Sequence, residues 1–463
     1  MKTAERETSV IRSPQDGSEV GVVSLAGPEE VRAALDANLR AAPALAQLAA
    51  HERAAMLRRV SDAVAAEREP LARTLALEAG KPISQARVEV GRAISVFAEG
   101  AEEATRIEGE VLPADVVPAG TGRMAIARRF PLSPVVGITP FNFPILLAAH
   151  KMAPAMACGA AITLKPPPQD PLTTLRLLEI IRGAGWPEGA VNVVPCHVEV
   201  AQILIDDPRV RMISFTGSAK AGWAIRARAG SKRVALELGG NAGAIIEADA
   251  DLEWAAARCA VSGFTYAGQS CISTQRIFVQ ERVLSRFLDL FLPRVRALKV
   301  GDILDDKTDV GPMIAEEAAR RVESWIAEAV REGAEVAVGG KRRGAVLEPT
   351  VLLKTKPTMK VNGEEVFAPL VTVMPYARLD DAIAQVNDSP YGLQAGVFTA
   401  DLKTMFHAYA ALDVGGVNGN DIPSYRVDRL PYGGAKASGL GREGVRYAIQ
   451  EMTELRLLTL KLD

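Results

Sequence analysis

Cys271 is the residue of this chain whose neighbours best suit it to chemistry. It follows Gly268-Gln269-Ser270, whereas Cys158 and Cys259 lie in alanine-rich surroundings typical of apolar packing residues. A flexible approach with hydroxyl neighbours predicts a thiol that faces a cleft, where its thiolate could act as a nucleophile. The local residues also fit a buried packing cysteine, so other parts of the chain must decide.

Three polar clusters lie at or just after the ends of predicted strands. They contain Asn142, the pair Gly217-Ser218 and Glu237. Backbone N–H groups at a helix start can hold a pyrophosphate, which suits Gly217-Ser218. Individually, the three clusters could be a helix cap, turn glycines and a solvated acid. Because parallel sheets bind ligands at the carboxyl ends of their strands, we expect all three in one site.

The elements that would position these residues alternate regularly from residue 134. The apolar runs predict strands at 135–138, 161–164, 191–194, 212–215 and 234–238, with helices at 145–158, 172–183, 198–205 and 219–229. This alternation indicates a parallel sheet with helices on both faces. Residues 240–430 alternate in the same way and predict a second α/β domain.

The flanking segments have a different character. Residues 1–26 predict edge strands, and helices follow, one of them ending at Gly80 and another spanning about 84–106. Residues 111–131 predict a projecting β-hairpin arm, and 458–462 a final strand that could pair with it. An exposed strand edge often pairs with another subunit, so we interpret the arm as an oligomerisation element.

Composition excludes several classes of protein. The 54 Lys and Arg residues balance 56 Asp and Glu, so no excess charge attracts nucleic acid or an anionic membrane. Four scattered cysteines and four histidines argue against a disulfide framework and against a metal site. Met1–Glu7 contains no apolar signal core. We expect a cytoplasmic protein with a small-molecule substrate.

The ordered set of motifs resembles the NAD(P)-dependent aldehyde dehydrogenase superfamily along nearly the whole chain. The motifs that carry the resemblance are Pro140-Phe141-Asn142-Phe143-Pro144, Leu164-Lys165-Pro166, Phe215-Thr216-Gly217-Ser218, Glu237-Leu238-Gly239-Gly240-Asn241, Gly268-Gln269-Ser270-Cys271, Glu364-Glu365-Val366-Phe367-Ala368-Pro369 and Pro431-Tyr432-Gly433-Gly434-Ala435-Lys436.

This resemblance implies an α/β fold with two doubly wound parallel-sheet domains and a β-hairpin arm. Residues 1–110 and 132–239 would form the Rossmann-like NAD(P)-binding domain, and 240–440 the catalytic domain. Residues 111–131 and 441–463 would supply the arm and the C-terminal strand. The family also implies a homodimer or homotetramer in which the arm meets the C-terminal strand of a neighbour.

The resemblance also assigns catalytic roles. Cys271 would attack the aldehyde, and the Asn142 amide with the Cys271 backbone N–H would bind the oxyanion. Glu237 would activate water to hydrolyse the thioester. Lys151 and Glu454 resemble positions of a proton-relay path.

The cofactor would be NAD or NADP. Lys165 would bind the adenosine ribose, Ser218 the pyrophosphate, and Glu365 with Phe367 the nicotinamide side. Pro168 stands where NAD-preferring members have an acid, so the sequence does not fix the preference. Further positions that would contact the cofactor are Thr139, Pro140, Phe141, Gly217, Leu238 and Gly239.

The positions that would line the substrate tunnel are polar. They include His150, Ser270, Ile272 and Arg426, and we expect a short polar or anionic aldehyde bound by Arg426 and His150. Alternatively, Arg426 pairs with a nearby acid, Asp421 or Asp428, and faces away.

Two other functions stay open. In a CoA-acylating semialdehyde dehydrogenase the thioester would pass to CoA, although relatives of that kind typically lack the Glu237 base. A non-catalytic homologue would keep the fold alone, although retention of Asn142, Glu237 and Cys271 argues against it.

Overall fold

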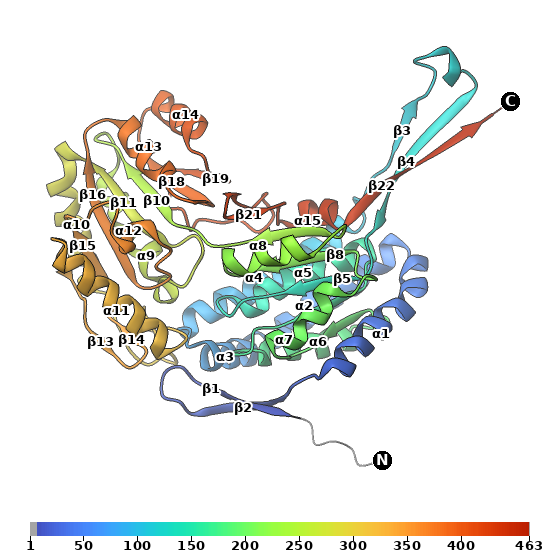
Figure 1. The fold of residues 1–463 in the computed structure, drawn as a ribbon, viewed down its shortest axis with the longest axis horizontal. Coiled ribbons are helices and arrows are strands. Elements are labelled where there is room, and N and C mark those ends of the chain that lie inside the picture. The colour runs from blue at the N-terminus through green and yellow to red at the C-terminus, as the bar shows by residue number, and fades with distance from the viewer. Residues whose placement is uncertain (1–6, 463) are drawn as a thin grey trace.

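The computed structural model describes residues 7–462 and is built around two large sheets (Figure 1). The prediction for Met1–Glu7 therefore lies almost wholly outside the described residues. The first sheet has six strands in the order β21-β9-β8-β5-β6-β7. Its strands are β5 (Val135–Ile138), β6 (Ile162–Lys165), β7 (Val191–Val193), β8 (Met212–Thr216), β9 (Arg233–Glu237) and β21 (Gly439–Leu440). All neighbours are parallel except β21, which pairs with β9 in the antiparallel sense.

Helices cover both faces of this sheet because its strands alternate apolar side chains between the two faces. Val135 and Met212 pack with helices α2 to α6, whereas the next residue of each strand, Val136 and Ile213, packs with α1, α7 and α8. These helices are α1 (Pro28–Gln47), α2 (Ala50–Ala66), α3 (Arg68–Ala79), α4 (Ile83–Glu103), α5 (Pro144–Cys158), α6 (Leu172–Gly183), α7 (Val198–Asp206) and α8 (Ala219–Arg228). The predicted alternation of strands and helices is confirmed, and Gly80 ends α3 with a φ of 66°.

The second sheet has seven strands in the order β12-β15-β16-β11-β10-β18-β19. They are β10 (Ala242–Ile246), β11 (Thr274–Gln280), β12 (Glu335–Val338), β15 (Thr350–Leu353), β16 (Leu370–Tyr376), β18 (Gln394–Phe398) and β19 (Gly416–Gly419). Only the edge strand β12 is antiparallel to its neighbour. The associated helices are α9 (Leu252–Phe264), α10 (Leu284–Arg296), α11 (Glu316–Arg331), α12 (Lys360–Gly363), α13 (Leu379–Asn387) and α14 (Leu402–Ala411). Smaller elements are β1 (Thr8–Arg12) with β2 (Glu19–Ser24), β13 (Arg342–Arg343) with β14 (Val346–Leu347), and β17 (Tyr391–Gly392) with β20 (Ala435–Lys436).

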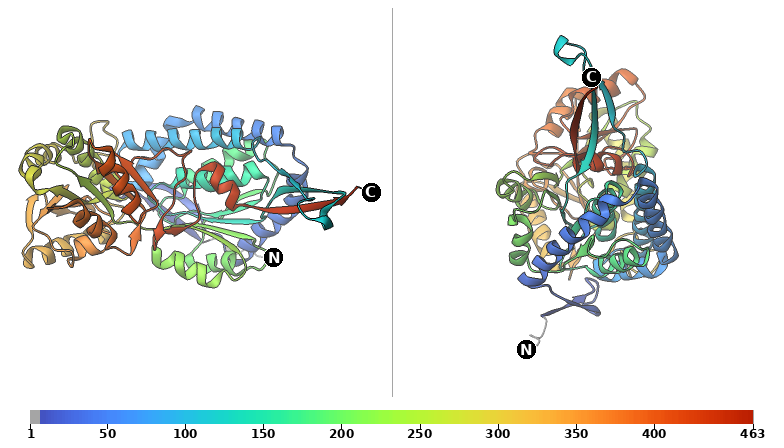
Figure 2. Two further views of the ribbon diagram at one scale, coloured as in Figure 1. Left: turned by 90° about the horizontal axis from the view of Figure 1, so that it is seen from above. Right: turned by 90° about the vertical axis from the view of Figure 1, so that its right-hand side faces the viewer.

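A three-stranded arm projects from the body of the molecule (Figures 1 and 2). It consists of β3 (Glu110–Pro113), β4 (Arg123–Pro131) and β22 (Thr453–Lys461), which follows helix α15 (Val445–Glu451). The predicted final strand begins earlier than expected and pairs with β4 of its own chain over all nine residues. The pairing confirms the prediction that the final strand pairs with the arm, and it leaves one edge of β22 open.

Two features that would indicate a membrane or a metal as a partner are absent from residues 7–462. No helix in that range is both long and apolar enough to cross a membrane. Within the same range, no group of three or more His, Cys, Asp and Glu side chains is arranged to hold a metal ion.

Candidate active site

A cavity of about 660 Å³ lies where loops from the carboxyl ends of the first sheet meet the loops that lead into β10, β11 and β16 of the second sheet. It brings together most of the site residues predicted from the sequence. Those that line it are Pro140, Phe141, Asn142, Gly217, Ser218, Glu237, Leu238, Gly239, Ser270, Cys271, Ile272, Glu365, Phe367 and Arg426. The strand register explains why some of these residues lie close together. Ile138 of β5 pairs with both Lys165 of β6 and Phe215 of β8, so the carboxyl ends of these three strands are aligned.

Five predicted residues do not line this cavity. Thr139 and Lys165 lie at the carboxyl ends of β5 and β6, and both are buried. His150 and Lys151 are buried on α5 behind the cavity wall. Glu454 lies on β22 in the arm.

The loop that carries Cys271 is fixed by contacts with both halves of the molecule. The side chain of Gln269 is fully buried and accepts from the Ile314 amide at 2.9 Å. The Tyr266 hydroxyl donates to the carbonyl oxygen of Ala79 at 2.8 Å. A Cβ on Gly240 would collide with the Cys271 carbonyl oxygen, so this glycine lets the Glu237 loop pass close to the cysteine loop. The nucleophile and the carboxylate are thereby held in adjoining loops.

The Cys271 thiol lies in a mostly apolar environment. Burial raises its pKa to about 12, against the opposing effects of a hydrogen bond with Tyr432 and the charge of Arg426. The Cys271 Sγ lies 3.1 Å from the Tyr432 hydroxyl oxygen. Because a thiol with so high a pKa is protonated near neutral pH, the site must stabilise the thiolate when it forms.

Asn142 is held from two sides. Its side-chain amide nitrogen donates to the Gln269 carbonyl oxygen at 3.0 Å, in the loop that leads to Cys271. The Lys81 ammonium donates to the backbone carbonyl oxygen of Asn142 at 2.7 Å and forms a buried ion pair with Glu89. The amide group is thus placed beside the cysteine loop, where a neutral donor could bind an oxyanion without protonating the thiolate.

Glu237 ends β9 with a buried carboxylate. Its Oε2 has no hydrogen-bond partner among the described residues. Burial raises its pKa well above the ordinary range, and repulsion by the Glu443 carboxylate adds to this effect. A carboxylate with a raised pKa that faces a cavity is suited to act as a general base.

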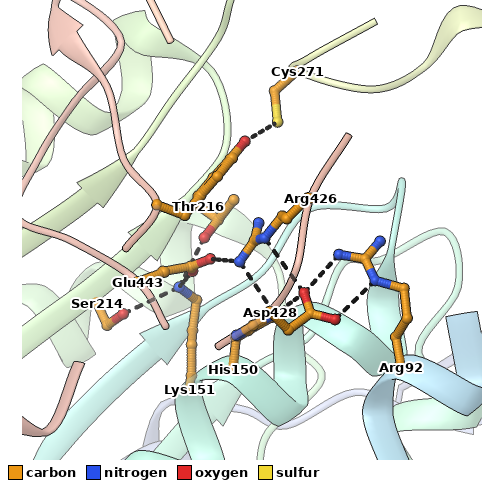
Figure 3. Close-up of polar contacts among 10 residues, drawn as sticks. Arg92, His150, Lys151, Ser214, Thr216, Cys271, Arg426, Asp428 and Glu443 are labelled. Carbon is orange, nitrogen blue, oxygen red and sulfur yellow. Dashed lines mark hydrogen bonds and ion pairs between the residues drawn. The ribbon is translucent and has the colours of Figure 1, made fainter. Parts of the chain in front are cut away.

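Glu443, and not Glu454, lies beside Lys151. The Lys151 Nζ is 3.7 Å from Glu443 Oε1 and donates to the hydroxyls of Thr216 and Ser214 at 2.8 and 3.1 Å (Figure 3). Glu454 instead pairs with Arg456 and Arg211 on the outside of the arm. The expectation that Glu454 lies on a path with Lys151 is therefore wrong, and Glu443 occupies that place because the antiparallel pairing of β21 with β9 returns the chain to the sheet just before Glu443.

E443Q tests the electrostatic link between the two carboxylates. Burial opposes the ionisation of Glu443, but the charges of its basic neighbours, including Lys151 and Arg426, lower its pKa. Removal of this negative charge should lower the pKa of Glu237, so the acidic limb of the kcat profile should move to lower pH. The profile is measured from steady-state rates across pH. An acidic limb at the wild-type position would show that Glu443 does not influence the base.

Arg426 lies at the centre of a buried charged network. Its Nη2 lies 3.1 Å from Glu443 Oε2 and 3.2 Å from His150 Nε2, and its Nε lies 3.4 Å from Asp428 Oδ1 (Figure 3). Its guanidinium stacks on the Tyr432 ring at 3.7 Å. The two alternatives for Arg426 are thus both realised in part, because it pairs with Asp428 and also lines the cavity. His150, 3.0 Å from Asp428, lies behind it and does not reach the cavity wall.

Most of the predicted cofactor residues line one side of the cavity in closely packed, glycine-containing loops, which we call the dinucleotide cradle. A Cβ on Gly217 would collide with the Phe215 ring, and a Cβ on Gly239 with the Glu365 carboxylate. The backbone at Gly217 leads into the N-terminus of α8, which is capped by Ser218 and suits a pyrophosphate. Burial raises the pKa of Glu365 to about 7, and its Oε1 accepts from the Gly240 amide at 2.8 Å. The residues present therefore fit a nicotinamide dinucleotide.

Other functional candidates emerge only from the structure. Arg92 of α4 and Arg258 of α9 line the cavity, as do Tyr432 and Glu443. Both arginines lie on helices whose charged residues look like solvated surface in the sequence, so no local signal distinguished them. Tyr432 belongs to one of the motifs that carry the family resemblance, but nothing in that motif indicated that its hydroxyl reaches sulfur.

A cysteine and a buried carboxylate that line one cavity with a dinucleotide cradle are the groups that a dehydrogenase working through a covalent thiol adduct requires. The model of the aldehyde dehydrogenase family matches residues 1–458. The chain belongs to the aldehyde dehydrogenase family, and it is an NAD(P)-dependent enzyme that oxidises aldehydes.

Three similar proteins illustrate the range of the family. The 3-sulfolactaldehyde dehydrogenase of Priestia aryabhattai is 44% identical over 89% of this chain and 87% of its own. Aldehyde dehydrogenase 21 from Physcomitrella patens, solved in complex with the reaction product succinate, is 40% identical with a TM-score of 0.97, covering 99% and 96% of the two chains. Glyceraldehyde-3-phosphate dehydrogenase from Methanocaldococcus jannaschii, solved with NADP, is 37% identical with a TM-score of 0.95, covering 99% and 100%.

Proposed function

We propose that this enzyme oxidises a short anionic aldehyde to the carboxylic acid, with Cys271 as nucleophile and Glu237 as the base that activates water. The observation that carries the proposal is that Cys271, Asn142 and Glu237 line one cavity with the dinucleotide cradle. The Cys271 thiolate attacks the aldehyde carbon, and the Asn142 amide with the Cys271 N–H stabilises the oxyanion. When bound in the cradle, NAD(P)+ would supply the acceptor for the hydride that the carbon of the thiohemiacetal on Cys271 loses as it becomes a thioester.

The chain's own residues then complete the reaction. The Glu237 carboxylate takes a proton from water, and the hydroxide attacks the thioester carbonyl, so that the acid leaves and the Cys271 thiolate returns. Glu443 and Lys151 lie on the side of Glu237 away from Cys271. They are suited to accept the proton that Glu237 takes from water and to pass it away from the cavity. The presence of this base favours hydrolysis over transfer to CoA.

Three of the four arginines that line the cavity, Arg92, Arg258 and Arg426, support an anionic substrate. Arg92 binds Asp428 with two hydrogen bonds of 2.9 and 2.6 Å, and Arg258 binds Asp421 through Nε at 2.7 Å. Each arginine retains at least one guanidinium nitrogen that bonds to none of the described residues, so it can add a second partner. The three relatives named above act on or release a sulfonate, a carboxylate and a phosphate compound, and all of these are anions.

Replacement of the cavity arginines tests this choice of substrate. In R92A and R258A, the KM for succinate semialdehyde should rise about tenfold, because one charge-assisted hydrogen bond contributes roughly 1.5 kcal/mol. The KM for butanal, which has a similar length and no charge, should change little. NADH and NADPH formation without CoA provides the assay. R106A, at an exposed arginine just beyond the end of α4, is the control. Equal effects on both aldehydes would remove the anionic assignment.

We also infer that the arm joins two copies of the chain. The open edge of β22 exposes unpaired backbone groups, and several of its leucines are exposed, which an isolated protein would leave in contact with water. A homodimer or a homotetramer built from such dimers fits this edge. Sedimentation equilibrium of the full chain measures the state, and a monomer at micromolar concentration would remove the inference.

Two observations favour the use of both NAD and NADP. One relative was solved with NADP, and Pro168 stands where NAD-preferring members of the family have an acid. Pro168 is exposed just beyond the carboxyl end of β6 and carries no charge, so it presents no acid that would repel a 2′-phosphate. Burial lowers the pKa of the nearby Lys165. Comparison of KM for NAD and NADP in the same assay measures the preference.

A further inference from the structure

We propose that Tyr432 is a further catalytic residue, whose phenolic O–H donates a hydrogen bond to the Cys271 thiolate and so stabilises the nucleophile. This inference rests on the proposed role of Cys271. The Tyr432 oxygen and the Cys271 sulfur are 3.1 Å apart, and both residues line the cavity. Among the described residues, the hydroxyl has no other hydrogen-bond partner.

The direction of this hydrogen bond follows from the surroundings of the phenol. Tyr432 is 4% exposed, and burial raises its pKa well above the ordinary value, so the hydroxyl keeps its proton. A neutral phenol beside a thiolate can only donate to it. No covalent step is involved, because the proton stays on the phenol oxygen and the electron pair on sulfur remains free to attack.

Arg426, which lies over the face of the Tyr432 ring, makes the Tyr432 hydroxyl a stronger hydrogen-bond donor. Its guanidinium lies over the Tyr432 ring at 3.7 Å, and Glu443 and Asp428 hold it there. A cation on the ring face withdraws electron density from the phenol and makes its O–H a better donor. The buried network therefore influences the sulfur without touching it. The positive charge of Arg426 polarises the Tyr432 ring, and the ring's hydroxyl contacts the sulfur.

The other groups around Cys271 oppose or only partly assist ionisation. Glu237 and Glu365 repel a negative charge on sulfur, and Arg426 attracts it through the ring. The Asn142 amide nitrogen is engaged with the Gln269 carbonyl oxygen. Tyr432 is accordingly the side chain in the described part of the protein that donates directly to sulfur.

The test measures ionisation of the Cys271 thiol and does not require turnover. In Y432F the pH midpoint of iodoacetamide alkylation, and of thiolate absorbance near 240 nm, should move up by about one unit, because a hydrogen bond to a charged group is lost. The phenyl ring of the variant keeps the contact with the Arg426 guanidinium, so the thermal unfolding midpoint should stay close to that of the wild type. Y409F, at an exposed tyrosine of α14, is the matched control. C271A gives the background signal.

A second variant changes the donor in the opposite direction. Tyr432→3-fluorotyrosine keeps the shape of the side chain and makes the phenol more acidic, so the thiol midpoint should move down. If the pH midpoint of the Cys271 thiol in both variants matched that of the wild type, Tyr432 would have no role in stabilising the thiolate. Cys271 could still be the nucleophile in that case. A fast-reacting thiol that survives in C271A would instead contradict the proposed function, so the two failures are distinct.

Discussion

Cys271→Ala is expected to abolish aldehyde oxidation, with kcat falling by more than about 10⁴-fold, because no other cysteine among the described residues lines the cavity. The remaining cavity should still bind the dinucleotide, since the cradle is built from the loops after β5, β8 and β9 and from Glu365 and Phe367. The measurement is the steady-state rate of NAD(P)H formation, together with the Kd of the cofactor from fluorescence titration.

Cys259→Ala is the matched control for this variant. Cys259 is a fully buried residue of α9 that faces the apolar core, so its replacement should cost about 1 kcal/mol of stability and leave kcat unchanged. If Cys271→Ala retained turnover while Cys259→Ala lost it, the nucleophile would be misassigned. Loss of cofactor binding in Cys271→Ala would show that the substitution had disturbed the loop and would invalidate the comparison.

The catalytic centre was largely predictable because its residues lie at strand ends. Asn142, Ser218 and Glu237 each follow a short, strongly apolar run, and parallel topology then forces those ends to one edge of the sheet. Cys271 lies on the loop that enters β11, and the ordered motifs were needed to interpret it. For these residues, local pattern and global fold lead to the same conclusion.

The groups behind the centre were not predictable in the same way. Glu443 and Tyr432 reach the cavity because the chain folds back and pairs β21 with β9, which lies far earlier in the sequence. No periodicity in the C-terminal segment indicates this return. The family resemblance points to Glu454, and the sequence alone does not show that Glu443 is the acid that lies beside Lys151.

The buried charges reduce the stability of the fold, and this cost indicates that they serve the reaction. Arg426, Glu443, Asp428 and Lys151 are each at most 10% exposed, and removal of such groups from water carries a desolvation penalty that ion pairing only partly offsets. Well-packed apolar residues would stabilise this region as well or better. We infer that the network persists because it sets the ionisation of Glu237 and supports the phenol beside Cys271.

Glu237→Gln should separate the two halves of the reaction. The thioester can still form, because Cys271, Asn142 and Tyr432 are intact, but water lacks its base and hydrolysis becomes slow. We therefore expect a burst of about one NAD(P)H per active site followed by a steady rate reduced by roughly 10²- to 10⁴-fold, the usual contribution of a general base. Stopped-flow absorbance measures the burst, and intact-protein mass spectrometry detects the acyl group on Cys271.

Two added conditions make the Glu237→Gln result decisive. Because burial keeps the pKa of Glu237 high, the wild-type hydrolysis rate should rise with pH until the carboxylate ionises, whereas the amide in the variant cannot titrate and that limb should vanish. Added CoA supplies an external thiol. If CoA restored full turnover to Glu237→Gln and also accelerated the wild type, the enzyme would be acylating. If the burst disappeared together with the steady rate, Glu237 would act before the thioester forms, as the acceptor of the Cys271 proton.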